Sequence, residues 1–232
     1  MIFTKQGWAV LENDTHISRW VEQNGTLENE KNLIEGHIAP YVDFAGSTVI
    51  DVGAMIGDHT ATYSRLVGPK GRVLAFEPNA AAYACLSYNS HMLQHPNVMP
   101  FFFALGAQRG KATMNRLHNV GASYLTQDFI ADEDVVDVLT LDSAMEAVTV
   151  PPISLIKIDA EGYEPFVLQG ARNTIKAHAP AIYYEVHQNA LKRNGYAPQD
   201  IKHLLQTYGY TKFNIIERCS ETSPQYNVLA LL

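Results

Sequence analysis

Apolar and polar positions follow two different periods along most of this chain. Short apolar runs, which read as buried strands, are each followed by a stretch whose apolar residues recur on one helical face. The predicted core strands are Val49–Val52, Arg72–Phe76, Val98–Ala104, Leu155–Ile158 and Ala181–Val186. The helices predicted between or after them are Asp58–Val67, Asn79–His95, Glu164–Gln169 and Pro198–Tyr208. This alternation is typical of an α/β fold built on a parallel sheet.

Two regions interrupt the alternation. The segment Gly106–Asp142 contains a tight turn and several short β-like runs, which predicts an antiparallel insertion ahead of the fourth core strand. Near the C-terminus, Thr211–Glu217 and Tyr226–Leu232 flank a polar loop, which predicts a closing antiparallel hairpin.

The first 45 residues form a separate lead-in. We expect a short hairpin near Trp8–Leu11, then helical stretches around Ile17–Gln23 and Leu27–Val42. Such a segment could lie over a cofactor as a lid. The length of 232 residues favours one large domain, here residues 46–232 after this lead-in, over the alternative of two small domains.

Charge and composition narrow the choice of partners and compartment. The net charge of −7 argues against a broad phosphate-binding face, so a small molecule is expected as partner and nucleic acid is not. No apolar run is long enough to span a bilayer. The first residues lack the features of a signal peptide, and Cys85 and Cys219 lack spaced partners for zinc or a disulfide framework. We therefore expect reduced thiols in a cytoplasmic protein; the oligomeric state is left open.

The run VIDVGAMIG ends a predicted buried strand in a carboxylate and a glycine turn. Gly53 and Gly57 would let a ligand approach the backbone closely, and the helix that follows offers free N–H groups to a carboxylate or phosphate. Asp51 could accept a hydrogen bond from a ligand ammonium or from the loop. Glu77 closes the next apolar run and suits the hydroxyls of a ribose, while Pro78 would stop that strand.

The glycine spacing distinguishes between two nucleoside cofactors. It is not the dinucleotide fingerprint G-x-G-x-x-G, because Met55 occupies the second glycine position and no third glycine follows. This favours S-adenosyl-L-methionine over a nicotinamide cofactor, as does the final hairpin. An adenine ring could rest at the turn that follows the third strand. The expected cofactor contacts are Asp51, Gly53, Ala54, Gly57, Glu77, Pro78 and Leu105.

The segment DAEGYE places three carboxylates within six residues. Like charges this close repel each other, so a cation or solvent must offset them. Glu164 is most simply an acid in the first turn of a helix. Asp159 and Glu161 should lie at the C-terminal end of the fourth strand, in the same crevice as Asp51.

The next strand ends in Glu185 and His187, whose side chains should point the same way because strand residues alternate. Adjacent parallel strands would then bring both to Asp159 and Glu161. One use is general-base chemistry, in which His187 or a carboxylate takes a proton from an attacking hydroxyl. Another is a hard-cation site that orients an oxygen substrate. A metal ion is not predicted, because no dense ligand motif is present. The predicted catalytic residues are Asp159, Glu161 and His187.

Taken together, these motifs resemble the FkbM family of S-adenosylmethionine-dependent methyltransferases over roughly Thr48–His187. The resemblance rests on VIDVGAMIGDHT, VLAFEPNAAAYACLSYN and VLTLD, and above all on LIKIDAEGYEPFVLQGA followed by YYEVH. It implies a class I methyltransferase fold, which is Rossmann-like, with a mostly parallel seven-stranded sheet and a C-terminal antiparallel hairpin. It also implies methyl transfer, usually to a hydroxyl oxygen on a natural product, a saccharide or a related small molecule.

The resemblance assigns roles position by position. Cofactor binding corresponds to Asp51, Gly53, Gly57 and Glu77, and the active-site edge to Asp159, Glu161 and His187. Met55 stands where many relatives have asparagine, and Ala160 where valine is common. Two alternatives remain: a nicotinamide-dependent oxidoreductase on a Rossmann-like sheet, and a non-catalytic cofactor-binding module.

Overall fold

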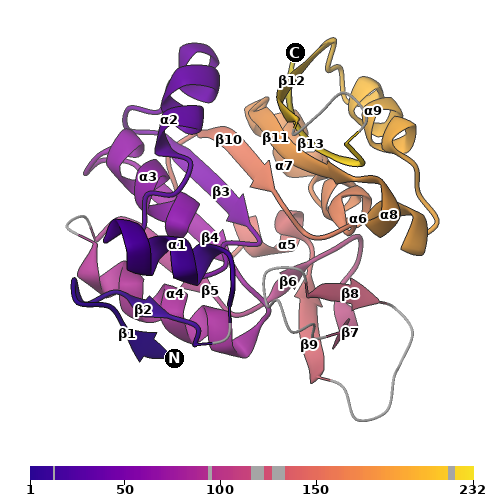
Figure 1. Ribbon diagram of the computed structural model, residues 1–232. Coiled ribbons are helices and arrows are strands. Elements are labelled where there is room, and N and C mark those ends of the chain that lie inside the picture. The colour runs from indigo at the N-terminus through magenta and orange to yellow at the C-terminus, as the bar shows by residue number, and fades with distance from the viewer. Residues whose placement is uncertain (13, 94–95, 116–122, 127–133, 219–222) are drawn as a thin grey trace.

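A seven-stranded sheet forms the centre of the protein (Figure 1). The computed structural model describes residues 1–232 except 13, 94–95, 116–122, 127–133 and 219–222, so Cys219 lies outside the described residues. The strands lie in the order β12-β13-β11-β10-β3-β4-β5. Their bounds are β3 Thr48–Val52, β4 Arg72–Phe76, β5 Val98–Phe101, β10 Ile153–Ile158, β11 Ala181–His187, β12 Lys212–Arg218 and β13 Gln225–Leu231. All neighbours pair in parallel except the last hairpin and its contact with β11. The sheet therefore confirms the predicted class I architecture.

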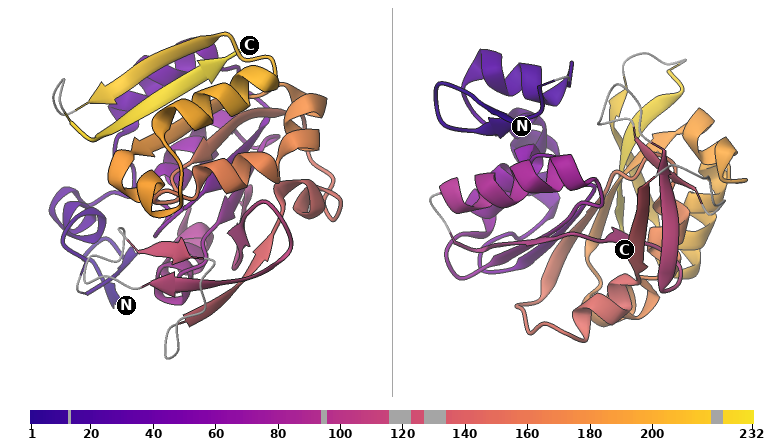
Figure 2. Two further views of the ribbon diagram at one scale, coloured as in Figure 1. Left: turned by 90° about the vertical axis from the view of Figure 1, so that its right-hand side faces the viewer. Right: turned by 90° about the horizontal axis from the view of Figure 1, so that it is seen from below.

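Helices cover both faces of this sheet (Figure 2). One face holds α3 and α4; the other holds α6, α7 and α9. Their bounds are α3 Asp58–Val67, α4 Ala80–Met92, α6 Glu164–Gln169, α7 Arg172–His178 and α9 Pro198–Thr207. Strand alternation directs the packing, since Ile50 belongs to the core on the α6, α7 and α9 face and neighbouring Val49 to the core on the α3 face. No helix in the described ranges is long and apolar enough to cross a membrane.

Three short helices lie outside the elements that the sequence predicts. They are α5 Leu141–Met145, α7 Arg172–His178 and α8 Gln188–Arg193. Each has at most seven residues, too few to show a helical period, and none has a proline in its first turn like that of the equally short α6. They are held by tertiary contacts, as where Asp142 accepts hydrogen bonds from the backbone N–H groups of Asn173 and Thr174 at the start of α7.

The predicted third strand is divided between two sheets. Strand β5 ends at Phe101, and β6 (Ala104–Leu105) pairs with β9 (Asp134–Leu139) in a second sheet. The pairing with β4 ends here because the chain after Glu77 offers no further N–H group to the third strand. Pro78 has none, and the Asn79 N–H donates to the Glu77 carboxylate instead. That second sheet also contains β7 (Gly110–Asn115) and β8 (Tyr124–Thr126), both in antiparallel pairs, so the predicted insertion is confirmed.

The lead-in contains the predicted hairpin and helices, with the second helical stretch broken into short pieces. Its elements are β1 Ile2–Phe3, β2 Ala9–Val10, α1 Ile17–Asn24, α2 Lys31–Leu33, a π-helical turn Ile34–Ile38 and a 3₁₀ turn Ala39–Tyr41. Asn89 of α4 anchors it, because its side chain donates to the carbonyls of Ala9 and Ile56 and accepts from the Ala9 N–H. The lead-in is thus attached to the first βα units of the sheet.

Candidate active site

A cavity of about 500 Å³ opens at the C-terminal ends of the central strands. It lies where the strand order reverses between β3 and β10, the place where open α/β sheets bind ligands. Seven of the predicted site residues line it: Gly53, Glu77, Pro78, Leu105, Asp159, Glu161 and His187. The other three, Asp51, Ala54 and Gly57, are not among its lining residues.

Glu77 faces this cavity from the end of β4. Its two carboxylate oxygens accept hydrogen bonds from the backbone N–H groups of Met55 (2.9 Å) and Asn79 (2.7 Å). Burial raises the pKa of Glu77 to about 7, although these two bonds act in the opposite direction. A carboxylate has about four acceptor positions, so Glu77 retains capacity for a ligand's hydroxyl groups.

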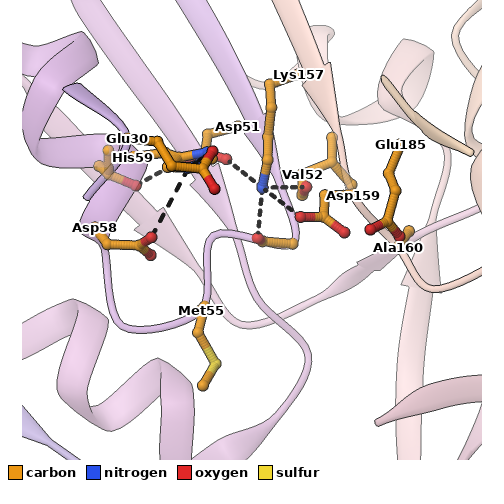
Figure 3. Close-up of polar contacts among 12 residues, drawn as sticks. Glu30, Asp51, Val52, Met55, Asp58, His59, Lys157, Asp159, Ala160 and Glu185 are labelled. Carbon is orange, nitrogen blue, oxygen red and sulfur yellow. Dashed lines mark hydrogen bonds and ion pairs between the residues drawn. The ribbon is translucent and has the colours of Figure 1, made fainter. Parts of the chain in front are cut away.

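Asp51 faces the interior of the protein, beneath α3. It is fully buried, accepts a hydrogen bond from the Thr60 hydroxyl (2.6 Å) and lies 3.3 Å from the Lys157 Nζ (Figure 3). The Lys157 Nζ also donates to the carbonyl oxygens of Val52 and Gly53. The β3–β10 register places Asp51 and Lys157 side by side, and so the acid neutralises a lysine. The sequence analysis missed Lys157. A single lysine within an apolar run, LIKI, indicates a buried ammonium group that needs a carboxylate partner.

Backbone contacts explain the glycine turn after β3. A Cβ atom on Gly53 would lie 1.8 Å from the Asp159 carbonyl oxygen, and the φ angle of Gly53 is +73°. Glycine is therefore required for the ends of β3 and β10 to approach each other. A Cβ atom on Gly57 would lie 3.1 Å from the Leu86 Cδ1 of α4. Met55 has a φ of +51°, a conformation that asparagine tolerates better than methionine.

The acidic loop after β10 is held in shape by Glu164. This buried carboxylate accepts from the backbone N–H groups of Ala160 and Gly162, so it holds the loop as well as beginning α6. Glu161 has a φ of +53°, which is unusual for a residue with a side chain. Strained backbone of this kind persists where the surroundings fix it, and it turns the Glu161 side chain into the cavity.

Four ionisable side chains meet at the edge formed by β10 and β11, and we call them the acidic edge: Asp159, Glu161, Glu185 and His187. The Glu161 Oε2 lies 3.5 Å from the His187 Nδ1. One Glu185 oxygen accepts from the Gln225 amide, whereas the other, Oε2, is buried without a hydrogen-bond partner. The sequence analysis placed these four residues together, and the structure confirms that grouping.

Burial and mutual repulsion perturb the acidic edge. Burial, and then the charges of Asp159 and Glu164, raise the pKa of Glu161 to about 8. Burial, followed by the charges of Asp159 and Glu161, raises the pKa of Glu185 to about 10. Burial, together with the Arg193 charge, lowers the pKa of His187. The imidazole is therefore neutral near pH 7 and available as a proton acceptor or a ligand.

The lead-in contributes the opposite wall of the cavity. Its lining residues are Asp14, His16, Ile17, Asn29 and Glu30. Glu30 accepts a hydrogen bond from the His59 Nε2 at the start of α3, at 3.1 Å (Figure 3). Arg65, two turns further along α3, pairs with Glu28 and Glu35. These contacts hold the lead-in against the cavity mouth.

The Glu30–His59 pair is expected to make this attachment pH-dependent. Burial alone would lower the pKa of His59, but the hydrogen bond to Glu30 and the Asp58 charge outweigh it and raise the pKa to about 9. A raised histidine pKa stabilises the fold fully below the unfolded value of about 6.5, and that stabilisation is lost as the pH rises through about 9. The loss should amount to at most about 3–4 kcal/mol, given about 1.4 kcal/mol for each pKa unit.

Urea unfolding of wild type and of a His59→Gln variant at several pH values measures this effect. The difference in unfolding free energy between them should shrink between pH 6.5 and 9.5. A variant at exposed His203 of α9 serves as the control and should show no such trend. A difference for His59→Gln that does not change with pH would contradict the assigned charge state.

Comparison with known proteins decides the family. The model of the methyltransferase FkbM domain matches residues 51–212. This chain belongs to the FkbM methyltransferase family. The match runs from the end of β3 to the start of β12, and so it includes the glycine turn, Glu77 and the whole acidic edge. The resemblance inferred from the motifs is thereby confirmed.

Individual relatives are distant. Hexuronic acid methyltransferase AglP from Haloferax volcanii is 27% identical over 155 residues, which are 67% of this chain and 59% of that protein. The chain thus spans less than two thirds of the length of this relative. The crystal structure of methyltransferase FkbM from Methylobacillus flagellatus KT matches with a TM-score of 0.60 at 17% identity, over 83% of this chain and 46% of the other. Aeropyrum pernix fibrillarin, solved with natively bound S-adenosyl-L-methionine, matches with a TM-score of 0.53 at 11% identity, over 87% and 73%. At these identities the two structures show the class I methyltransferase fold alone.

Proposed function

We propose that this protein transfers a methyl group from S-adenosyl-L-methionine to a hydroxyl oxygen of a saccharide or a related small molecule. One observation carries the proposal: a single cavity is lined both by Glu77 and by the acidic edge. The family membership supports the cofactor, and the relative named as a hexuronic acid methyltransferase supports a sugar-like acceptor. When bound, the cofactor supplies an electrophilic methyl group.

The residues at the β4 end of the cavity fit a nucleoside. Glu77 has acceptor positions left for the two ribose hydroxyls, because backbone N–H groups use only two of about four. Pro78 and Leu105 add apolar surface of the kind that an adenine ring contacts. Gly53 contributes accessible backbone, whereas Asp51 acts indirectly, by fixing Lys157 beneath the turn.

The residues at the β10–β11 end fit a hydroxyl-bearing acceptor. Asp159, Glu161 and His187 line the cavity and accept hydrogen bonds from hydroxyl groups in their unprotonated forms. They orient the acceptor oxygen and provide a base for the proton that it loses, a contribution of roughly 10²–10⁴-fold. Positioning the reacting atoms inside one cavity lowers the barrier further, by up to about 7–11 kcal/mol. The lead-in supplies the opposite wall of this space.

Isothermal titration of the purified chain with S-adenosyl-L-methionine, S-adenosylhomocysteine and NADH tests the proposal. We expect saturable binding of the first two and none of NADH. Binding of NADH alone would favour the oxidoreductase. Release of S-adenosylhomocysteine with a panel of sugars and sugar acids then separates an enzyme from a non-catalytic module.

Glu77→Gln should weaken S-adenosyl-L-methionine binding by about 10- to 100-fold, since hydrogen bonds to charged groups contribute about 1.5–3 kcal/mol. Asp142→Asn is the matched control, because Asp142 also accepts backbone N–H bonds but lies away from the cavity. Its cofactor affinity should equal that of wild type. Equal affinities for Glu77→Gln and wild type would show that Glu77 does not bind the cofactor.

A further inference from the structure

Three side chains of the acidic edge converge on one point. One carboxylate oxygen each from Glu161 and Glu185 and one ring nitrogen of His187 all lie within 4.8 Å of one another. Glu161 comes from the loop after β10, and the other two from the end of β11. Ligand atoms of one cation lie about 3–4 Å apart, given metal–oxygen distances of about 2.1 Å. Small side-chain rotations would bring these three atoms to that spacing.

Glu185 is the most informative member of this group. The residue is only 7% exposed, yet it lines the cavity. Gln225 donates to its Oε1, whereas its Oε2 is buried without a hydrogen-bond partner. Figure 3 shows the Glu185 carboxylate turned towards the loop of Asp159 and Ala160. A buried, unpartnered carboxylate oxygen is unfavourable by itself, so its position points to a ligand that satisfies it.

The nearby protein cations do not neutralise this group. In the part of the chain that the structure describes, neither the Glu161 nor the Glu185 carboxylate has an ion pair with lysine or arginine. Lys157 faces Asp51 and Asp159, and Arg193 donates to the Glu161 backbone carbonyl while stacking over the Tyr124 ring. When both carboxylates are ionised, a divalent cation between them would offset their negative charges.

We propose that Glu161, Glu185 and His187 bind one divalent cation. Two carboxylates with one imidazole suit a cation that accepts oxygen and nitrogen ligands together, and three protein ligands leave coordination positions open. The purpose of the cation rests on the proposed methyl transfer: its open positions would hold the acceptor oxygen beside the cofactor site. Asp159 is outside the ligand group, although it also lines the cavity.

Titration of the full chain with Mn²⁺, after removal of metals with a chelator, tests this proposal. The electron paramagnetic resonance signal of free Mn²⁺ should fall as about one ion binds to each chain. Electron spin-echo modulation should detect an imidazole nitrogen coupled to the bound ion. Glu185→Gln should weaken Mn²⁺ binding by at least about 10-fold, and His187→Gln should also abolish the nitrogen coupling.

Two controls keep the result specific. Asp137→Asn removes an exposed carboxylate on β9 and should leave Mn²⁺ affinity unchanged. Circular dichroism and titration with S-adenosyl-L-methionine, without Mn²⁺, show whether each variant keeps its fold and its cofactor site.

Cofactor binding without specific Mn²⁺ binding would overturn the cation site alone. Specific Mn²⁺ binding without cofactor binding would support the cation site and overturn the proposed function. Mn²⁺ binding that survives both Glu185→Gln and His187→Gln would also overturn the site.

Discussion

Lys157→Met is expected to destabilise the protein by about 3–5 kcal/mol, the usual effect of removing one partner from a buried ion pair. Lys157 is 3% exposed and Asp51 is fully buried, so the variant leaves the Asp51 carboxylate without a cation in the interior. It also removes the donor that holds the Val52 and Gly53 carbonyl oxygens at the end of β3. Urea unfolding followed by circular dichroism measures the loss.

Two further variants define the cause. The double variant Lys157→Met with Asp51→Asn should be more stable than Lys157→Met alone, because no buried charge is left unpaired. Lys111→Met breaks an exposed pair with Asp137 and should change stability by at most about 1 kcal/mol. If Lys157→Met proves as mild as Lys111→Met, the buried pair is not what holds the end of β3.

Asp159→Asn and Glu161→Gln are expected to reduce methyl transfer by roughly 10²–10⁴-fold, the range for loss of a positioned general base. Both side chains line the cavity at the β10 end, away from Glu77, so affinity for S-adenosyl-L-methionine should stay close to that of wild type. Turnover is measured as release of S-adenosylhomocysteine, and affinity by titration.

The two amide variants should differ in a second property. Glu161→Gln removes a proposed cation ligand and should weaken Mn²⁺ binding, whereas Asp159→Asn should not. Asp137→Asn, on the exposed side of β9, is the control for both and should retain full turnover. Unchanged turnover in Asp159→Asn and Glu161→Gln would refute their catalytic assignment.

Much of the sheet could be read from the chain directly. Strand β4 has the predicted bounds, Arg72–Phe76, and α3 and α6 agree with their predicted ranges. These elements have clear apolar runs or end at glycine or proline, which are local signals. The third strand was predicted wrongly as one continuous element, because its end depends on tertiary contacts beyond β4, where the Asn79 N–H donates to the Glu77 carboxylate.

The site also divides into features that local sequence signals predicted and features that tertiary contacts decided. That the acidic edge lies at the ends of two strands follows from alternation and from the parallel order of an α/β sheet, and the structure agrees. The sequence pattern did not predict the orientation of the Asp51 side chain, although it placed Asp51 correctly at the strand end. It faces Lys157 and Thr60 because of register and of the helix packed above it.

The amino-acid sequence by itself determined the order of strands and helices, the family and the residues carried at the strand ends, because period, turn chemistry and motif spacing are local properties. Only the tertiary structure decided which carboxylates are neutralised. Asp51 meets Lys157 across more than a hundred residues of chain, whereas Glu185 reaches the cavity with one oxygen unpaired. That difference depends on burial and on the register between strands, which no short segment of the chain contains.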